Sequence, residues 1–69
     1  MTFGETLRVA RERTGMSQDQ FGAATGIHRT HISLIERGVR EPRLDTLVKL
    51  SRGLGISPTE LIEWYVPSN

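Results

Sequence analysis

A chain of 69 residues has room for a single domain, and we expect one unit spanning residues 1–69. It contains no cysteine, which excludes disulfides, thiolate zinc sites and a cysteine nucleophile, and which suits a reducing cytoplasm. The net charge is only +1, so any nucleic acid would be bound with low non-specific affinity. No apolar run approaches the roughly 20 residues that span a membrane, and the charged, amphipathic start does not resemble a signal peptide.

The sequence predicts an all-α fold, because apolar residues recur at helical spacing and no stretch alternates with a period of two. Five helices are expected, at residues 3–14, 18–25, 28–37, 44–54 and 58–65. Three helix starts carry a hydroxyl residue followed three positions later by Glu or Gln, the capping-box pattern, at Thr2, Ser17 and Ser57. Glycines follow four helix ends, at positions 15, 26, 38 and 55.

The apolar spacing also predicts which side chains form the core. We expect inward-facing residues on all five helices and, at Ile27, just before the third helix: Phe3, Leu7, Ala10, Phe21, Ala24, Ile27, Ile32, Ile35, Leu44, Leu47, Leu50, Leu54 and Leu61. A core of this size gives modest stability unless a partner adds to it.

The segment from residue 18 to residue 37 indicates function. It reads as two short helices joined by Gly26, with the small Gly22 where the helices would touch. Between the isoleucines, the outer face of the second helix carries polar groups: His28, Arg29, Thr30 and Ser33. A helix-turn-helix presents such a helix to the DNA major groove, so the segment predicts double-stranded DNA as the partner.

Arg29 opens this exposed face, and a bidentate contact from Arg to guanine is the commonest specific base contact. Thr30 and Ser33 carry hydroxyl groups that suit either a base edge or a phosphate, and both roles stay open. Leu34 lies beside the face and either packs on Val39 or contacts a thymine methyl group.

Two histidines, His28 and His31, are spaced as metal ligands on a helix can be, but no third ligand is near. A phosphate or base contact is therefore favoured, and no metal or cofactor is expected. The spacing of Ser, His and Asp supports no catalytic arrangement, so the sequence predicts no enzyme.

The last predicted helix and the residues after it are unusually apolar for a terminus, with Ile62, Trp64, Tyr65 and Val66 in close succession. One short helix cannot bury all of them, and exposed apolar clusters usually mark an interface. We expect a homodimer through these residues, which would match a two-fold operator. The alternative is that the helix folds Trp64 back on the first helix.

From about residue 7 to residue 62 the chain resembles the Cro/C1-type (XRE-family) helix-turn-helix regulators of bacteria and phages. The resemblance is carried by RVARERTGMSQ at 8–18, the helix pair at 18–37, I-E-R-G-x-R-x-P at 35–42, L-x-T-L-x-K-L at 44–50 and L-G-I-S-P-T-E-L at 54–61. Residues 28–38 are most like the controller proteins of restriction–modification systems. The family fold is the five-helix, lambda-repressor-like DNA-binding domain.

The resemblance implies a role for several further residues. Gln18 would contact a phosphate, and Arg40 and Arg43 would bind phosphate or enter the minor groove. Arg11 and Glu36 match positions that form a partly buried salt bridge between the first and third helices.

Four positions depart from the family pattern. His28 stands where Ser or Thr usually caps the recognition helix, and Arg43 stands where Ser usually caps the fourth helix. Thr25 replaces an apolar residue, and Gly53 lies inside the fourth helix where Ala is usual, at a cost of about 1 kcal/mol.

The function implied is a cytoplasmic transcriptional regulator, associated with the nucleoid when it is bound to an operator. An alternative is an antitoxin whose residues 64–66 engage a toxin protein. RNA polymerase is a further candidate partner.

Overall fold

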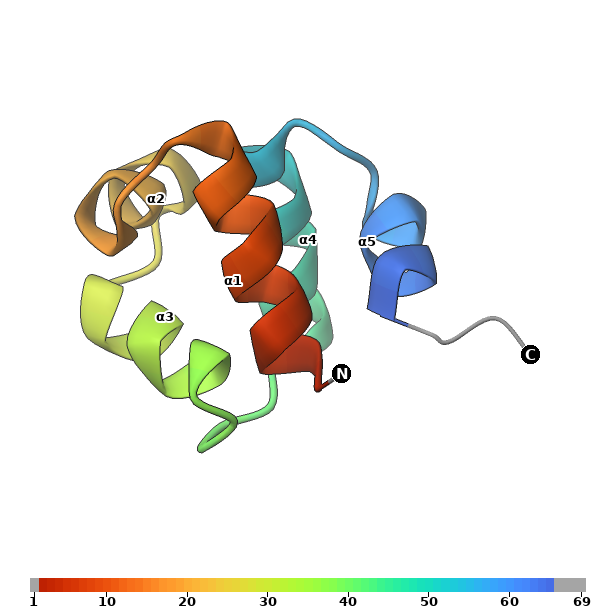
Figure 1. The fold of residues 1–69 in the computed structure, drawn as a ribbon, viewed down its shortest axis with the longest axis horizontal. Helices are drawn as coiled ribbons and strands as arrows, with labels where there is room; N and C mark the ends of the chain where they lie inside the picture. The colour runs from red at the N-terminus through yellow and green to blue at the C-terminus, as the bar shows by residue number, and fades with distance from the viewer. Residues whose placement is uncertain (1, 66–69) are drawn as a thin grey trace.

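The computed structural model describes residues 2–65, which form five helices and no strand (Figure 1). The helices are α1 (Phe3–Thr14), α2 (Gln18–Thr25), α3 (Arg29–Glu36), α4 (Leu44–Leu54) and α5 (Pro58–Tyr65). The all-α prediction is confirmed, and four helices have the predicted bounds. Helix α3 is one residue shorter at each end, because His28 and Arg37 are its caps. None of the helices in residues 2–65 has the length and apolar character needed to cross a membrane.

Local capping sets where three helices begin. The Thr2 hydroxyl accepts a hydrogen bond from the backbone amide of Glu5 at 3.1 Å, and the Glu5 carboxylate accepts one from the backbone amide of Thr2, also at 3.1 Å. This hydrogen bond to the backbone of Thr2 lowers the pKa of the Glu5 carboxyl from its ordinary value. The same reciprocal bonds join Ser17 to Gln20 and Ser57 to Glu60. All three predicted capping boxes are thus confirmed, and the four predicted glycines all have positive φ.

The core lies between α1 and the helices packed against it, with α2 closing one side against α3 and α4. Its almost fully buried side chains come from all five helices: Leu7, Phe21, Ile32, Ile35, Leu50 and Leu61. Helix α1 packs against α3, α4 and α5, and α2 packs against α3 and α4. As a result, α2 and α3 lie together at one end of the molecule and α5 lies at the other end (Figure 1).

The prediction of a core position is wrong for two residues, Leu44 and Ala24, which are both exposed. Leu44 is 83% exposed, although it points in nearly the same direction as Ser51, which lies seven residues later and is fully buried. Leu44 is the first residue of α4, and the buried residues of that helix begin only at Thr46. Ala24 is exposed because α2 instead turns the neighbouring Thr25 inward.

The buried Thr25 explains the glycine inside α4. A Cβ atom at Gly53 would collide with the Thr25 Cγ2 methyl and would lie 3.1 Å from Cε1 of Phe21. The Thr25 hydroxyl donates to the Phe21 carbonyl at 2.8 Å, so its polar atom is satisfied in the core. The two departures from the family pattern therefore fit one another where α2 meets α4.

Candidate nucleic-acid interface

The connection between α2 and α3 is closed by two glycines with different tasks. Gly26 has a φ of 75°, a left-handed conformation that favours glycine. Its backbone amide donates to the Gly22 carbonyl at 2.9 Å and so ends α2. A Cβ atom at Gly22 would lie 2.7 Å from the Ile27 carbonyl oxygen. Only glycine allows α2 to approach the start of α3 this closely, and the approach sets the angle at which α3 leaves the turn.

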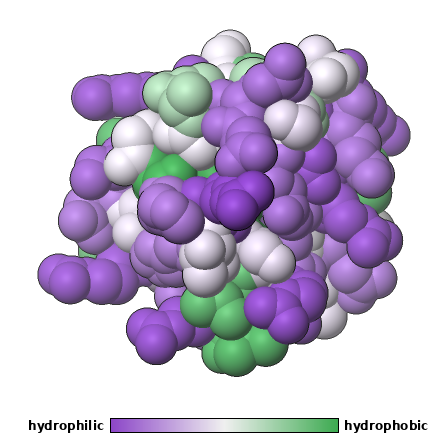
Figure 2. Space-filling model, turned by 90° about the vertical axis from the view of Figure 1, so that its left-hand side faces the viewer, coloured by the Kyte–Doolittle hydropathy of each residue, from purple (hydrophilic) through white to green (hydrophobic). Residues whose placement is uncertain are grey.

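Helix α3 has one buried side and one exposed side. Ile32, Ile35 and Glu36 are buried against the other helices. The opposite side forms a shallow polar hollow of about 300 Å³ with the start of α2, and four predicted DNA-binding residues line it: Gln18, Arg29, Thr30 and Ser33. The face that carries α2 and α3 is largely hydrophilic, with an apolar patch at its lower edge (Figure 2).

His28 takes over the cap that Ser or Thr usually provides. Its Nδ1 atom accepts the backbone amide of Thr30 at 3.1 Å. An accepting Nδ1 carries no proton, so the neutral ring has its N–H at Nε2, which remains a donor on an exposed side chain. The other histidine, His31, is partly buried. Within residues 2–65 no three His, Cys, Asp or Glu side chains are grouped so that they could hold a metal ion.

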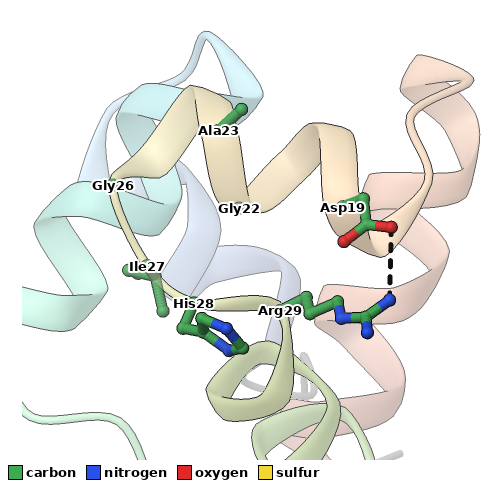
Figure 3. A pocket seen from close by; sticks show the side chains of 7 residues that line it. All are labelled: Asp19, Gly22, Ala23, Gly26, Ile27, His28 and Arg29. Carbon is green, nitrogen blue, oxygen red and sulfur yellow. Dashed lines mark hydrogen bonds and ion pairs between the residues drawn. The ribbon is translucent and has the colours of Figure 1, made fainter.

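Arg29 has an acidic neighbour that the sequence analysis did not identify. Its Nη1 atom lies 3.4 Å from Oδ2 of Asp19, which is the second residue of α2 (Figure 3). The two side chains are 64% and 69% exposed. They belong to a second, larger hollow of about 450 Å³ between α2 and the start of α3. The available signal was an acidic residue in the first turn of the helix that precedes the recognition helix.

The loop after α3 carries the remaining predicted DNA-binding arginines. The amides of Val39 and Arg40 both donate to the Leu34 carbonyl, at 2.9 and 3.3 Å, so the loop folds back onto the end of α3. Arg40 is exposed, and Val39 is 63% exposed. Arg43 caps α4 without a side-chain hydrogen bond, as its departure from the family pattern suggested, and its Nε atom lies 3.7 Å from Asp45.

A buried ion pair ties this face to the rest of the fold. The Nε and Nη2 atoms of Arg11 donate to the two carboxylate oxygens of Glu36, at 2.7 and 3.0 Å. The Gln18 amide also donates to Glu36 at 3.0 Å, and Nη1 of Arg11 donates to the Met16 carbonyl at 2.9 Å. The hydrogen bond to Glu36 raises the pKa of Arg11 above its ordinary value, although burial acts in the opposite direction. Helices α1, α2 and α3 are therefore joined around one carboxylate.

The predicted dimer surface on α5 is partly exposed and partly folded back. Ile62, Trp64 and Tyr65 are 42%, 49% and 41% exposed, while Val66 lies outside the described residues. The Tyr65 ring meets Phe3 edge to face, with the ring centres 5.7 Å apart. Trp64 borders a hollow of about 280 Å³ that is otherwise lined by α1: Thr6, Val9, Ala10 and Arg13. The contact of Tyr65 with Phe3 and the hollow between Trp64 and α1 fit the interpretation that α5 folds back on α1, and the dimer contact stays a prediction.

Comparison with known proteins identifies the family. The profile described as Helix-turn-helix matches residues 7–61. The chain belongs to this helix-turn-helix family. Among curated proteins it is similar to control protein C.BamHI of Bacillus amyloliquefaciens, at 37% identity over 70 aligned positions that cover 100% of this chain and 86% of the relative. The predicted resemblance to Cro/C1-type regulators is thereby confirmed.

Solved structures of helix-turn-helix proteins share the fold. The restriction–modification controller protein C.AhdI from Aeromonas hydrophila has a TM-score of 0.82 at 37% identity, covering 86% of this chain and 89% of that one. The P22 c2 repressor in complex with a synthetic operator has a TM-score of 0.80 at 33% identity, covering 88% of this chain and 92% of that one.

Proposed function

We propose that this protein is a sequence-specific DNA-binding regulator of transcription in the bacterial cytoplasm, of the restriction–modification controller type. One observation carries the proposal: α3 turns Arg29, Thr30 and Ser33 outward together while its other side is buried in the core. A helix held in this way can enter the major groove without rearrangement. The similarity to control proteins and to an operator-bound repressor supports it.

In this interface, base reading and backbone binding fall to different residues. Arg29, Thr30 and Ser33 line the polar hollow of α3 and face base edges. The Nε2–H of His28 and the exposed side chains of Arg40 and Arg43 bind phosphates on either side. Gln18 reaches the same phosphates from the start of α2, where Glu36 holds its amide group in place.

The protein acts as a homodimer through the exposed apolar side chains of α5. Helix α5 lies at the opposite end of the molecule from α2 and α3, so a contact through it leaves both α3 helices exposed (Figure 1). A two-fold pair of recognition helices reads half-sites about 34–36 Å apart. Ile62 and Trp64 have the largest exposed fractions among the apolar residues of α5, at 42% and 49%.

The test is selection of a binding sequence from a random duplex pool, followed by titration of single-base variants. Arg29→Ala should lose discrimination at one base pair in each half-site, at a cost of about 1–3 kcal/mol, while keeping the fold. Arg40→Ala and Arg43→Ala should instead weaken binding to all sequences and reduce the salt dependence by about one unit per lost contact in each subunit. Unchanged base preference in Arg29→Ala would refute the assignment.

The dimer is tested by Ile62→Asp, with Thr59→Asp as the control, because Thr59 is an exposed polar residue on the same helix. Sedimentation should show a folded monomer for Ile62→Asp and a dimer for Thr59→Asp. A second candidate function uses the same apolar surface: an antitoxin would offer α5 to a toxin protein. A wild-type chain that is monomeric at micromolar concentration, yet still selects a DNA sequence, would favour that alternative.

A further inference from the structure

We propose that Asp19 is a positioning residue that sets the base preference of Arg29. The inference rests on the proposed function, since it names a specificity-determining residue of the same interface. An ion pair between Nη1 of Arg29 and Oδ2 of Asp19 joins the first residue of α3 to the first turn of α2 (Figure 3).

Both ends of the pair are attached to anchored backbone. The start of α2 is held by the reciprocal bonds of Ser17 and Gln20, and by the bond from Gln18 to the buried Glu36. The start of α3 is held by the His28 cap. The backbone of Asp19 therefore sits at a defined place relative to the axis of α3, which keeps its exposed carboxylate within reach of the long Arg29 side chain.

The bond leaves the useful edge of the guanidinium unoccupied. Asp19 engages Nη1, whereas the Nε–Nη2 edge of Arg29 makes no hydrogen bond to any residue from 2 to 65. Arg11 uses that same Nε–Nη2 edge for its two bonds to Glu36. Guanine presents two acceptors, O6 and N7, to a bidentate donor of this shape. Arg29 can therefore keep its contact with Asp19 while it reads a guanine.

Ordering Arg29 before it binds has an energetic advantage. A free arginine side chain carries about 2 kcal/mol of rotamer entropy, part of which is lost when it contacts a base. A carboxylate that already restricts the rotamers reduces this loss for the base that suits the held position. The competing explanation is that Asp19 is only an acidic residue at a helix N-terminus, where its charge favours α2.

The experiment measures discrimination rather than affinity. The wild-type protein selects a sequence from a random duplex pool, and each variant is then titrated against that duplex and its single-base variants. Asp19→Asn should reduce discrimination about 2- to 5-fold per half-site, and only at the base pair that Arg29→Ala affects. In the Arg29→Ala background, Asp19→Asn should leave discrimination at every position unchanged.

The matched control is Asp45→Asn. Within residues 2–65, Asp45 forms the other exposed ion pair with an arginine, at 3.7 Å from Arg43, and we propose that Arg43 binds a phosphate. Both variants remove one negative charge and should raise affinity for all duplexes, and this general effect cancels in a discrimination ratio. Asp45→Asn should therefore leave the base preference as in the wild type.

Three results would overturn the role of Asp19. If Asp19→Asn and Asp45→Asn have the same base preference, Asp19 only stabilises the N-terminus of α2, and Asp19→Asn should then also have a lower melting temperature than the wild type. Increased discrimination would show that the pair holds Arg29 away from the base. A changed preference in the Arg29→Ala background would show that Asp19 contacts DNA itself. If the wild-type protein enriches no sequence at all, the proposed function itself is wrong. If it enriches a sequence and Asp19→Asn shows the same base preference, only the role of Asp19 is wrong.

Discussion

Replacing Glu36 with Gln tests the buried network that joins the first three helices. Glu36 Oε2 accepts Nε of Arg11, and Oε1 accepts both Nη2 of Arg11 and the amide group of Gln18. A glutamine amide has one acceptor oxygen and one donor nitrogen. In either orientation its NH₂ group would face at least one of these donors, and the charge of Arg11 would lose its partner.

The expected cost follows from the burial of the pair. The side chains of Arg11 and Glu36 are 11% and 2% exposed, so solvent compensates little for the lost partner. Breaking one side of a buried pair typically costs about 3–5 kcal/mol. A chain of this length has a total stability of only about 3–10 kcal/mol, so the variant should lose a large part of it.

The assay is urea unfolding followed by circular dichroism, at one fixed protein concentration because a dimer couples stability to concentration. The control is Glu63→Gln, which removes the same charge from an exposed position of α5 and should change stability by less than about 0.5 kcal/mol. If Glu36→Gln unfolds, Arg11→Lys provides a milder variant, since it keeps the charge but loses the bidentate bonds and the contact with Met16. Equal midpoints for the variants at 36 and 63 would refute the reasoning.

Three further predictions concern stability. Gly4→Ala should cost about 1–3 kcal/mol in urea unfolding, because its Cβ would collide with the Ile35 carbonyl oxygen, and a gain in stability would contradict that packing. Gly53→Ala should be less unfavourable in urea unfolding in the Thr25→Ser background than in the wild type. The colliding methyl is then gone and the hydroxyl remains, so the contact of 3.1 Å with Cε1 of Phe21 is left to oppose a gain in helix propensity of up to about 1 kcal/mol. An equal effect in both backgrounds would show no coupling. Glu5→Gln should melt at a lower temperature than the wild type at pH 7, and the difference should vanish as the pH falls. A carboxyl group whose pKa is lowered by folding stabilises the fold above its ordinary pKa of 4.5, and this stabilisation is lost as the pH drops through the folded-state pKa. A difference that does not depend on pH would show that the ionised carboxylate is not its cause.

Local chemistry in the sequence determined the elements of this protein. Helix starts depend on groups three residues apart, as between Thr2 and Glu5, and helix ends depend on a glycine that can adopt positive φ, as at Gly15. Such interactions need no distant partner, which is why the helix boundaries that carry them could be predicted to the residue. The turn at Gly26 and the apolar spacing of Ile32 and Ile35 likewise sufficed to predict the recognition helix and its outward residues.

Tertiary packing decided what the spacing left ambiguous. Leu44 and Ala24 both have the helical spacing of core residues, and only the packing of the folded helices left them exposed. The sequence showed Gly53 as a weak helix residue, whereas the fold shows that a methyl group from α2 occupies the space of its missing side chain.

The same distinction holds for the interface. The sequence predicted that Arg29 would be exposed, because exposure follows from its place on one helix. Its ion pair with Asp19 joins two helices, and so does the bond from Gln18 to Glu36. Contacts of this kind depend on the angle and distance between helices, which are set by close approaches such as the one at Gly22. Helical periodicity carries no information about that angle, so only the folded structure could reveal which side chains hold the recognition residues in place.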